Sequence, residues 1–489
     1  MDNIKTVKKF TFDVGWVLAG SIAILALHFL QNPIMARYLG PDGLGLYSMV
    51  TMVAGIVSLI AGIGINGAVV KYVAEYKDDK GRLHAVVSSG LITMTIFGVI
   101  SSMVLFILSD TLASMFRMPS LSFLFKIYAF IFPFLLTYEV IMGLFNGLRE
   151  MKYYSFINTF QGFLTFSFIV ASLFLGFGVE GAVVGTMLAV ITAMGIATII
   201  MKKFVHFTIF DYKKNTKMLT LFGSRLMAAN SINLIYSRSD IFLIGYFLTA
   251  TDVGYYAAAL SLSRFFWRVP QSIQMITYPA TSEYWSKGKH ESLSKMIDIS
   301  MKYSACILLI VGLGVWFFAK DIVTFLFGEK FIYAVLPLQI LLIGTVINGA
   351  TSRSIGGSLA GAGHPELDLI KVSISATVNV LLNILLIPSF GIIGAAVATT
   401  ISLSIASALS LFFIIRTLQV KIDFKWYAKA FGIGFISVLI FANLSSDVNQ
   451  YILGFTILCT YILIVIKFLL TKEDNKMLKS LLYSLWKKN

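Results

Sequence analysis

The sequence predicts an all-α integral membrane protein in which fourteen transmembrane helices form two parallel six-helix lobes around a central cavity, followed by two C-terminal helices. Three observations predict this fold. Hydrophobic residues make up 57% of the 489 residues and charged residues only 13%, whereas about 25% of a soluble protein is charged. Apolar runs long enough to cross a bilayer recur along the chain, and several motifs of the first half return in the second.

The helices are predicted from apolar runs of roughly 20 residues, the length needed to cross the hydrocarbon core. Fourteen such runs lie near residues 12–33, 43–65, 84–108, 123–144, 155–176, 181–201, 218–248, 254–277, 297–319, 333–360, 369–388, 394–415, 427–445 and 450–470. The first run follows Lys5, Lys8 and Lys9 and continues without a small-residue cleavage site. It is therefore expected to stay in the protein as a signal anchor.

The two lobes are predicted from repeated motifs. Residues 177–186 (FGVEGAVVGT) return at 390–399 as FGIIGAAVAT. Leu39, Gly45 and Tyr47 likewise return as Leu248, Gly254 and Tyr256. Six spans per repeat is an even number, so both repeats insert in the same direction, as in transporters whose halves are related by an axis along the membrane normal.

These observations divide the chain into five parts. The predicted parts are a first lobe at 1–202, a cytoplasmic linker at 203–217, a second lobe at 218–416, the last two spans at 417–475 and an amphipathic cytoplasmic tail at 476–489. The tail places leucines on one helical face and lysines largely elsewhere, which favours a helix lying on the inner leaflet over a solvated tail.

The net charge of +15 is explained by the predicted membrane topology. When the N-terminus is assigned to the cytoplasm, most Lys and Arg fall in the segments on that side, as the positive-inside rule requires. Both termini are then cytoplasmic, and the protein is expected in the plasma or inner membrane. Because topology accounts for the charge, no nucleic-acid partner is predicted.

The sequence lacks the motifs of a catalytic or cofactor-binding protein. There is no Walker-type loop for ATP, no His/Cys cluster for a metal, and no loop between spans that is long enough to hold a soluble catalytic domain. Cys306 and Cys459 lie inside predicted spans without disulfide or metal spacing. The chain is therefore not expected to be an enzyme or to carry a cofactor, although coupling to a proton or sodium gradient is possible.

Five arginines fall within predicted spans, and all belong to the second repeat: Arg225, Arg238, Arg264, Arg268 and Arg353. A charged residue in the hydrocarbon costs about 2.5–3.5 kcal/mol on insertion scales, so this concentration needs an explanation. In an uninterrupted helix, Ser261, Arg264, Arg268 and Gln271 fall within about 80° of one another. The planar guanidinium fork suits phosphate oxygens, which predicts an anion-binding stripe on span eight.

Polar residues on two other spans are expected to face the same cavity. On span seven, Arg225, Asn233 and Asp240 share a stripe, while Arg238 points away from Asp240. On span one, Asp13, His28 and Gln31 lie on one side, and an offset of 209 residues maps Gln31 onto Asp240. The predicted chamber is therefore lined by spans one, seven and eight and is more cationic on its second-repeat side.

Structural alternatives stay open for most of these residues. Arg225 can snorkel to the interface, and Arg353, in the segment NGATSRSIGGS, can hydrogen-bond the backbone. Asp240 can neutralise Arg264 and Arg268 as a buried structural pair. His28 alone is more often a core histidine than a proton relay, and Glu139 can pair with Lys126 or lie near an interface.

The segment ARYLGPDGLGLYSMV at 36–50, the repeated FGxxGA motif and the fourteen-span layout resemble the polysaccharide transport family. These are O-antigen-type oligosaccharide flippases of the multidrug/oligosaccharidyl-lipid/polysaccharide (MOP) exporter superfamily. The resemblance implies two six-helix lobes that form a V around a cavity opening alternately inward and outward. It also implies movement of polyprenyl-diphosphate-linked sugars from the cytoplasmic to the outer leaflet.

The resulting hypothesis is an alternating-access flippase whose partners are a polyprenyl-diphosphate-linked glycan, membrane lipid and, by contact, glycan biosynthesis enzymes. The diphosphate is expected to dock on Arg264 and Arg268, with help from Arg225 or Arg353. Candidates for carrying a coupling proton or sodium ion are Asp240, Glu139, Asp13 and His28. The rival interpretations are a multidrug extruder of the same superfamily and a membrane-embedded glycan polymerase or ligase.

Overall fold

In the computed structural model, which describes residues 2–445 and 448–469, regular structure consists of helices, and no strand occurs within those residues. Helices are favoured in a membrane because their backbone hydrogen bonds are satisfied inside one segment. Nine described helices are long and apolar enough to cross a membrane, and a tenth crossing arises if the bent pair 120–147 counts as one span. The all-α membrane fold is thus confirmed, while the number fourteen stays a prediction.

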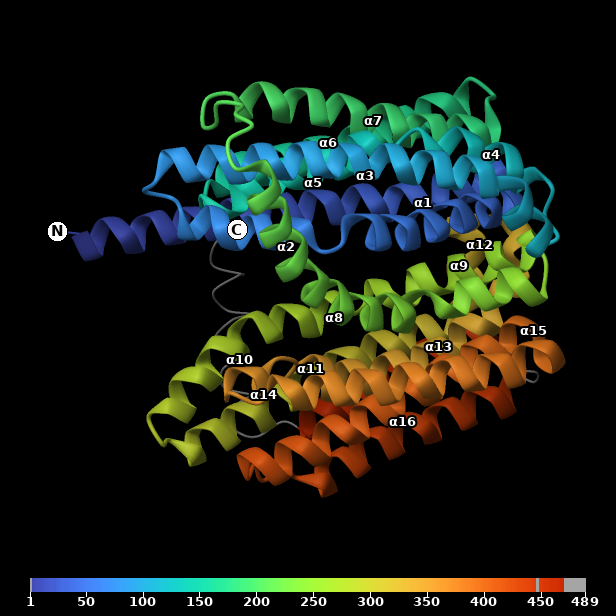
Figure 1. The fold of residues 1–489 in the computed structure, drawn as a ribbon. Helices are drawn as coiled ribbons and strands as arrows, with labels where there is room; N and C mark the ends of the chain where they lie inside the picture. Colours follow the sequence, from blue (N-terminus) through green and yellow to red (C-terminus); the bar gives the residue numbers. More distant parts are fainter. Residues whose placement is uncertain (1, 446–447, 470–489) are drawn as a thin grey trace, which may run out of the picture. The chain divides into compact units, whose positions relative to one another are not determined.

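The first of two compact units comprises residues 1–258 and 383–395. Its helices are α1 (Asp2–Gly62), α2 (Ile65–Glu75), α3 (Lys80–Met115), α4 (Ser120–Ala129), α5 (Phe132–Gly147), α6 (Met151–Phe174), α7 (Gly178–Met201), α8 (Tyr212–Phe247) and the first half of α9 (Ala250–Phe265). In Figure 1, α1, α3, α5, α6 and α7 run side by side, and α6 packs on both α1 and α7. The core of this unit lies between α2, α3, α5 and α7, and includes Val69, Val87, Ile141 and Phe145.

The second unit comprises residues 259–382 and 396–489. Its elements are α10 (Arg268–Ser286), α11 (His290–Phe317), α12 (Ala319–Phe327), the 3₁₀ helix η1 (Glu329–Ala334), α13 (Val335–Asn348), the π-helix η2 (Gly349–Arg353), α14 (Ser358–Gly361), α16 (Phe424–Leu444), α17 (Gln450–Ile464) and the π-helix η3 (Val465–Leu469). The helix α15 (Pro365–Leu418) passes through both units. In this unit α11 packs on α10, α13, α16 and α17.

Two helices are long because each continues through a glycine with non-helical backbone angles. In α1 this residue is Gly40 (φ 68°), and in α15 it is Gly391 (φ 59°). Gly178, which is equivalent to Gly391 in the repeated motif, also has a positive φ of 58°. Since glycine adopts these angles without steric cost, the shared motif encodes the same turn in both repeats.

The compact units do not coincide with the predicted lobes, because α8 belongs to the first unit. The hydroxyls of Thr93 on α3 and Thr216 on α8 lie 3.0 Å apart. A side chain at Gly223 of α8 would overlap the backbone carbonyl of Ile63, so these backbones touch directly. Close packing through a glycine therefore attaches α8 to α1, α2 and α3, and the predicted domain boundaries stay a prediction.

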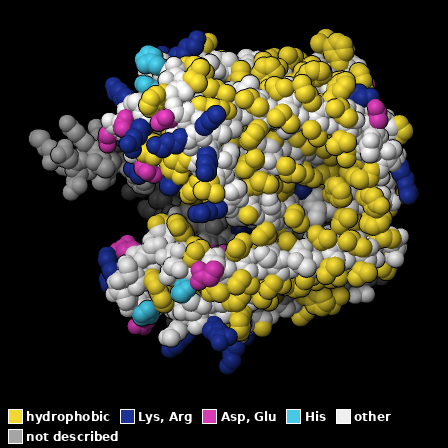
Figure 2. Space-filling model, in the orientation of Figure 1, with side chains coloured by type: hydrophobic (Ala, Val, Ile, Leu, Met, Phe, Trp, Pro, Cys, Tyr) yellow, Lys and Arg dark blue, Asp and Glu magenta, His cyan; other side chains and the backbone are white. Residues whose placement is uncertain are grey.

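The outer faces of the helices are largely apolar, as expected for contact with lipid. Figure 2 shows hydrophobic side chains over much of the visible face, with Lys and Arg gathered mainly toward helix ends. Large side chains such as Ile107, Ile199 and Phe325 are more than 60% exposed. Exposed apolar area of this extent marks a membrane protein. The predicted tail helix at 476–489 lies outside the described residues.

Candidate functional site

A polar cavity of about 650 Å³ lies within the first unit, between α1, α2, α5 and α8. Its polar lining residues are Ser58, Asn66, Glu139, Asn146, Asn230, Asn233 and Ser237. On α8, lining residues recur at positions 226, 230, 233, 234 and 237, which is the spacing of one helical face. Asn233 is the one member of the polar stripe predicted on this helix that lies among these lining residues, and the predicted stripe itself stays a prediction.

Glycines leave the space for this cavity. Gly55 and Gly62 on α1, Gly64 between the helices and Gly67 on α2 all belong to its lining. Gly64 has a positive φ of 65°, which lets the chain break between α1 and α2 while passing close to α8. The cavity thus forms where glycines at a helix break face polar side chains on α5 and α8.

Glu139 gives the cavity its electrostatic character. It is the one charged side chain in the described lining, which contains no Lys or Arg. The structure brings together two predicted site residues here, Glu139 and Asn233. It also adds Asn66, Asn146 and Asn230, which sequence reasoning missed. The polar lining provides hydrogen-bond donors and acceptors and one carboxyl group.

A cationic cluster occupies a different place, in the second unit. The guanidinium carbon of Arg353, on η2, lies 3.9 Å from the centre of the Trp267 ring. The guanidinium carbon of Arg264, at the end of α9, lies 5.5 Å from the same ring. Both distances are within the range of cation–π attraction. Arg264 and Arg353 were predicted as site residues, whereas the tryptophan that holds them near one another was not.

The stripe predicted for Arg264 and Arg268 requires a correction. The helix is interrupted: α9 ends at Phe265 and α10 begins at Arg268. Trp267 donates its backbone N–H to the carbonyl of Arg264, three residues back, at 3.1 Å, so the chain turns more tightly there than an α-helix. The assumed 100° per residue therefore does not carry through this point. Arg268 is exposed as the first residue of α10, and Gln271 lies one turn later, half buried.

Asp240 is almost completely buried, with 2% of its surface exposed. It accepts a hydrogen bond from the hydroxyl of Tyr256 at 2.9 Å and another from the backbone N–H of Ile241, also at 2.9 Å. Within the first unit, Asp240 therefore fixes α8 to the start of α9. Its predicted role in substrate or ion binding stays a prediction.

The remaining predicted residues lie elsewhere in the first unit. Arg225 is exposed on α8 and does not line the polar cavity. His28 is exposed on α1, whereas Gln31 is 6% exposed and donates from Nε2 to the sulfur of Met35 at 3.6 Å. The side chain of Asp13 lies outside the described residues.

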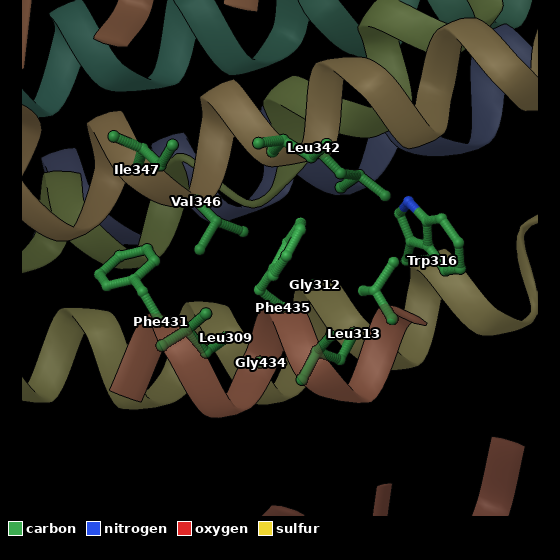
Figure 3. Close-up of a pocket in the computed structure, with 12 residues that line it drawn as sticks. Leu309, Gly312, Leu313, Trp316, Leu342, Val346, Ile347, Phe431, Gly434 and Phe435 are labelled. Carbon is green, nitrogen blue, oxygen red and sulfur yellow. The ribbon is translucent and has the colours of Figure 1, made fainter. Parts of the chain in front are cut away.

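The second unit also contains an apolar pocket of about 350 Å³ between α11, α13 and α16. Figure 3 shows Leu313, Trp316, Val346 and Phe435 around it, and all its other lining residues are apolar or glycine. Transfer of an unpaired polar group into such surroundings is unfavourable. This pocket therefore suits hydrocarbon and not a polar head group.

Comparisons with known proteins give the family. The sequence model described as "polysaccharide biosynthesis protein" matches residues 11–285, which is more than half of the chain. The chain belongs to the polysaccharide biosynthesis protein family. A second model, MatE, matches residues 226–385. The predicted resemblance to the oligosaccharide flippases of the MOP superfamily is therefore confirmed.

Individual relatives favour the flippase interpretation over the multidrug extruder. The chain is 26% identical over 404 residues to the probable low-salt glycan biosynthesis flippase Agl15 of Haloferax volcanii, covering 82% of each protein. It is 21% identical to the putative O-antigen transporter of Shigella flexneri, over 79% of this chain and 92% of that protein. A structure of the lipid II flippase MurJ in an inward closed conformation matches the fold with a TM-score of 0.74 at 15% identity, covering 91% of this chain and 98% of that one.

Proposed function

We propose that this family member is a flippase that moves a polyprenyl-diphosphate-linked glycan from the cytoplasmic to the outer leaflet by alternating access. Its family and the names of its relatives support a glycan flippase in a multi-pass membrane protein. The excess of Lys and Arg in alternate segments supports a plasma or inner membrane location with both termini in the cytoplasm.

The diphosphate is the part of the cargo that this proposal assigns to the second unit. The observation that carries the assignment is the pair of guanidinium groups, from Arg264 and Arg353, around the single ring of Trp267. A cation–π contact uses the face of a guanidinium, while its N–H donors lie in the plane and point outward. Two arginines held in this way can still donate to phosphate oxygens, and charge-assisted bonds of that kind are among the strongest in proteins.

Arg268 extends the same positive region along the chain. It is exposed at the first position of α10, and within the described residues it forms no ion pair. A helix N-terminus favours negative charge because its first backbone N–H groups are unpaired. The arginine and the helix end therefore act in the same direction on an anionic group.

A coupling ion is the least defined part of the proposal. Glu139 in the polar cavity and Asp240 in its buried hydrogen bond are the acidic candidates whose side chains the structure describes. Either side chain can exchange a proton or bind sodium during transport. Separately, contact with the enzymes that build the glycan would supply the cargo. Neither point affects the assignment of the diphosphate site.

The test is a leaflet-accessibility assay with the purified protein in vesicles containing a fluorescent polyprenyl-diphosphate sugar. The double variant Arg264→Ala/Arg353→Ala is expected to slow flipping by about a hundredfold or more, because it removes two charge-assisted hydrogen bonds of about 1.5–3 kcal/mol each. Arg268→Ala should have a smaller effect in the same direction, and Arg→Lys variants should recover part of the rate.

Arg416→Ala is the matched control, since Arg416 lies 5.9 Å from the ring of Phe412, away from this cluster. It should flip at the wild-type rate. Normal flipping by the Arg264/Arg353 double variant would refute the diphosphate site. Absence of flipping by the wild-type protein, together with extrusion of a cationic dye, would instead favour the multidrug extruder.

A further inference from the structure

The side chains that line the polar cavity of the first unit are unusual for a protein proposed to carry an anion. Carboxamides from three helices line it, namely Asn66 on α2, Asn146 on α5, and Asn230 and Asn233 on α8. One carboxylate, Glu139, accompanies them, and the lining contains no Lys or Arg among the described residues. This composition is unsuited to a diphosphate, which only accepts hydrogen bonds and is repelled by a carboxylate.

A carboxamide offers two N–H donors and a carbonyl acceptor, and a carboxylate adds further acceptor positions. A sugar hydroxyl is itself both donor and acceptor, so the two sets of groups complement one another. In the described part of the chain, the side chains of Asn66, Glu139, Asn146 and Asn230 have no hydrogen-bond or ion-pair partner in the protein. Their hydrogen-bonding capacity is therefore available to a molecule inside the cavity.

The surrounding helices position two of these groups. A Cβ at Gly143 would lie 2.9 Å from the Asn66 side-chain oxygen, and one at Gly62 would lie 3.9 Å from a Glu139 carboxylate oxygen. Glycine at position 143 therefore lets α5 pack directly against Asn66, and Gly62 lies beside Glu139. All five polar groups sit on helices, which position binding groups more precisely than loops do.

The size of the cavity favours a glycan over a metal ion as its occupant. A volume of about 650 Å³ lies within the range of about 300–1,000 Å³ found for small-molecule sites. A cation needs oxygens converging at about 2.3–2.6 Å, and no group of three or more His, Cys, Asp or Glu side chains in the described residues could hold one. The carboxamides of Asn66, Asn146 and Asn230 instead come from three separate helices.

We infer that this cavity is the glycan subsite of the transporter, where asparagine side chains and Glu139 bind sugar hydroxyls. The inference rests on the proposed flippase function. It concerns only the neutral sugars of the cargo and only residues of the first unit. Recognition of the glycan then depends on residues that carry no positive charge.

The experiment compares two forms of one lipid. The probe is the polyprenyl-diphosphate glycan extracted from the cells that make this protein, used intact and after mild acid has removed its sugars. Binding of both forms to the full-length protein in lipid nanodiscs is measured, and the ratio of the two affinities gives the contribution of the sugars. Asn→Leu is the diagnostic substitution because leucine has a similar shape and cannot hydrogen-bond.

Asn146→Leu and Asn230→Leu are each expected to reduce the affinity ratio about three- to tenfold, since one or two hydrogen bonds of about 0.5–1.5 kcal/mol are lost. Affinity for the sugar-free lipid should stay unchanged. Glu139→Gln should reduce the ratio less than either asparagine variant, because an amide also binds hydroxyls. Asn443→Leu is the matched control, since Asn443 bonds the Leu439 carbonyl at 2.8 Å near the end of α16 and lies outside the cavity.

Each result has a defined meaning. If the wild type binds both lipids equally, or if the cavity variants leave the ratio unchanged, the glycan subsite is refuted while the flippase proposal stands. If Glu139→Gln abolishes ion-dependent flipping and the asparagine variants do not change the ratio, the cavity is an ion site instead. If the wild type binds neither lipid, the proposed function itself fails.

Discussion

The two equivalent corners of the repeats, at residues 39–47 and 248–256, turn the chain by different local means. In the first, Gly40 takes a positive φ of 68° and Pro41 begins the next helical arm, a position that proline favours. In the second, Thr249 and Asp252 form a reciprocal capping box: the Thr249 N–H donates to Asp252 at 3.1 Å, and the Asp252 N–H donates to the Thr249 hydroxyl at 3.3 Å. A helix begins at this place in both repeats, but different residues start it in each.

The corners agree where their backbones touch. A Cβ at Gly45 would overlap the backbone carbonyl of Ala250, and one at Gly254 would overlap that of Pro41. Gly254 is equivalent to Gly45, and Ala250 to Pro41, at the same offset of 209 residues. The contact is therefore nearly symmetric and depends on the absence of a side chain. Duplication therefore preserved the backbone contact more closely than the chemistry of the turn.

The largest effect is expected from filling this contact. Gly45→Ala and Gly254→Ala should each lower the free energy of unfolding by about 2–3 kcal/mol, because an extra carbon in a closely packed place forces the backbones apart. Thermal unfolding of the purified protein in detergent measures the change. Gly55→Ala is the control on the same arm of α1, where an added Cβ would meet no atom within 4 Å. Equal stability of all three variants would show that the corners do not pack closely.

The equivalent tyrosines should differ in their contribution. Tyr47 shares a hydrogen bond of 3.0 Å with the hydroxyl of Thr186, whereas Tyr256 donates to the buried carboxylate of Asp240 at 2.9 Å. Tyr256→Phe is expected to cost about 2 kcal/mol and Tyr47→Phe about 1 kcal/mol, since hydrogen bonds to charged groups are stronger. The same unfolding measurement tests the order. A larger loss for Tyr47→Phe would mean that the carboxylate is held mainly by other groups.

The duplicated motifs allowed the equivalent turns of the two repeats to be predicted from the sequence. Gly178 and Gly391 were recognised as equivalent, and both have φ close to 60°. Local turns of this kind depend on the residue itself, so a sequence motif carries them. Of the polar stripe predicted on α8, Asn233 lies in the described cavity lining, whereas Arg225 and Asp240 do not.

The candidate sites were predicted less completely because they depend on tertiary contacts. Asn66 and Asn146 lie just beyond the ends of apolar runs and Asn230 lies within one, and only the packing of α2, α5 and α8 brings them together. Trp267 was not among the predicted site residues. The segment RFFWR at 264–268 did contain a signal, since a tryptophan between two arginines is a cation–π platform. The helix break at the same place also had a local signal that the prediction did not use: Pro270 has no N–H to donate to the carbonyl of Phe266, four residues back.

The smallest difference expected between the corners concerns their aspartates. Asp252→Ala removes half of the capping box and should lower the free energy of unfolding by about 1 kcal/mol. Asp42 accepts only a long hydrogen bond of 3.5 Å from the Thr251 hydroxyl in exposed surroundings. Asp42→Ala should therefore change stability by less than about 0.5 kcal/mol, as most surface substitutions do. If the two variants lose equal stability in parallel thermal melts, Asp42 also caps its helix, and the first corner depends on more than Gly40 and Pro41.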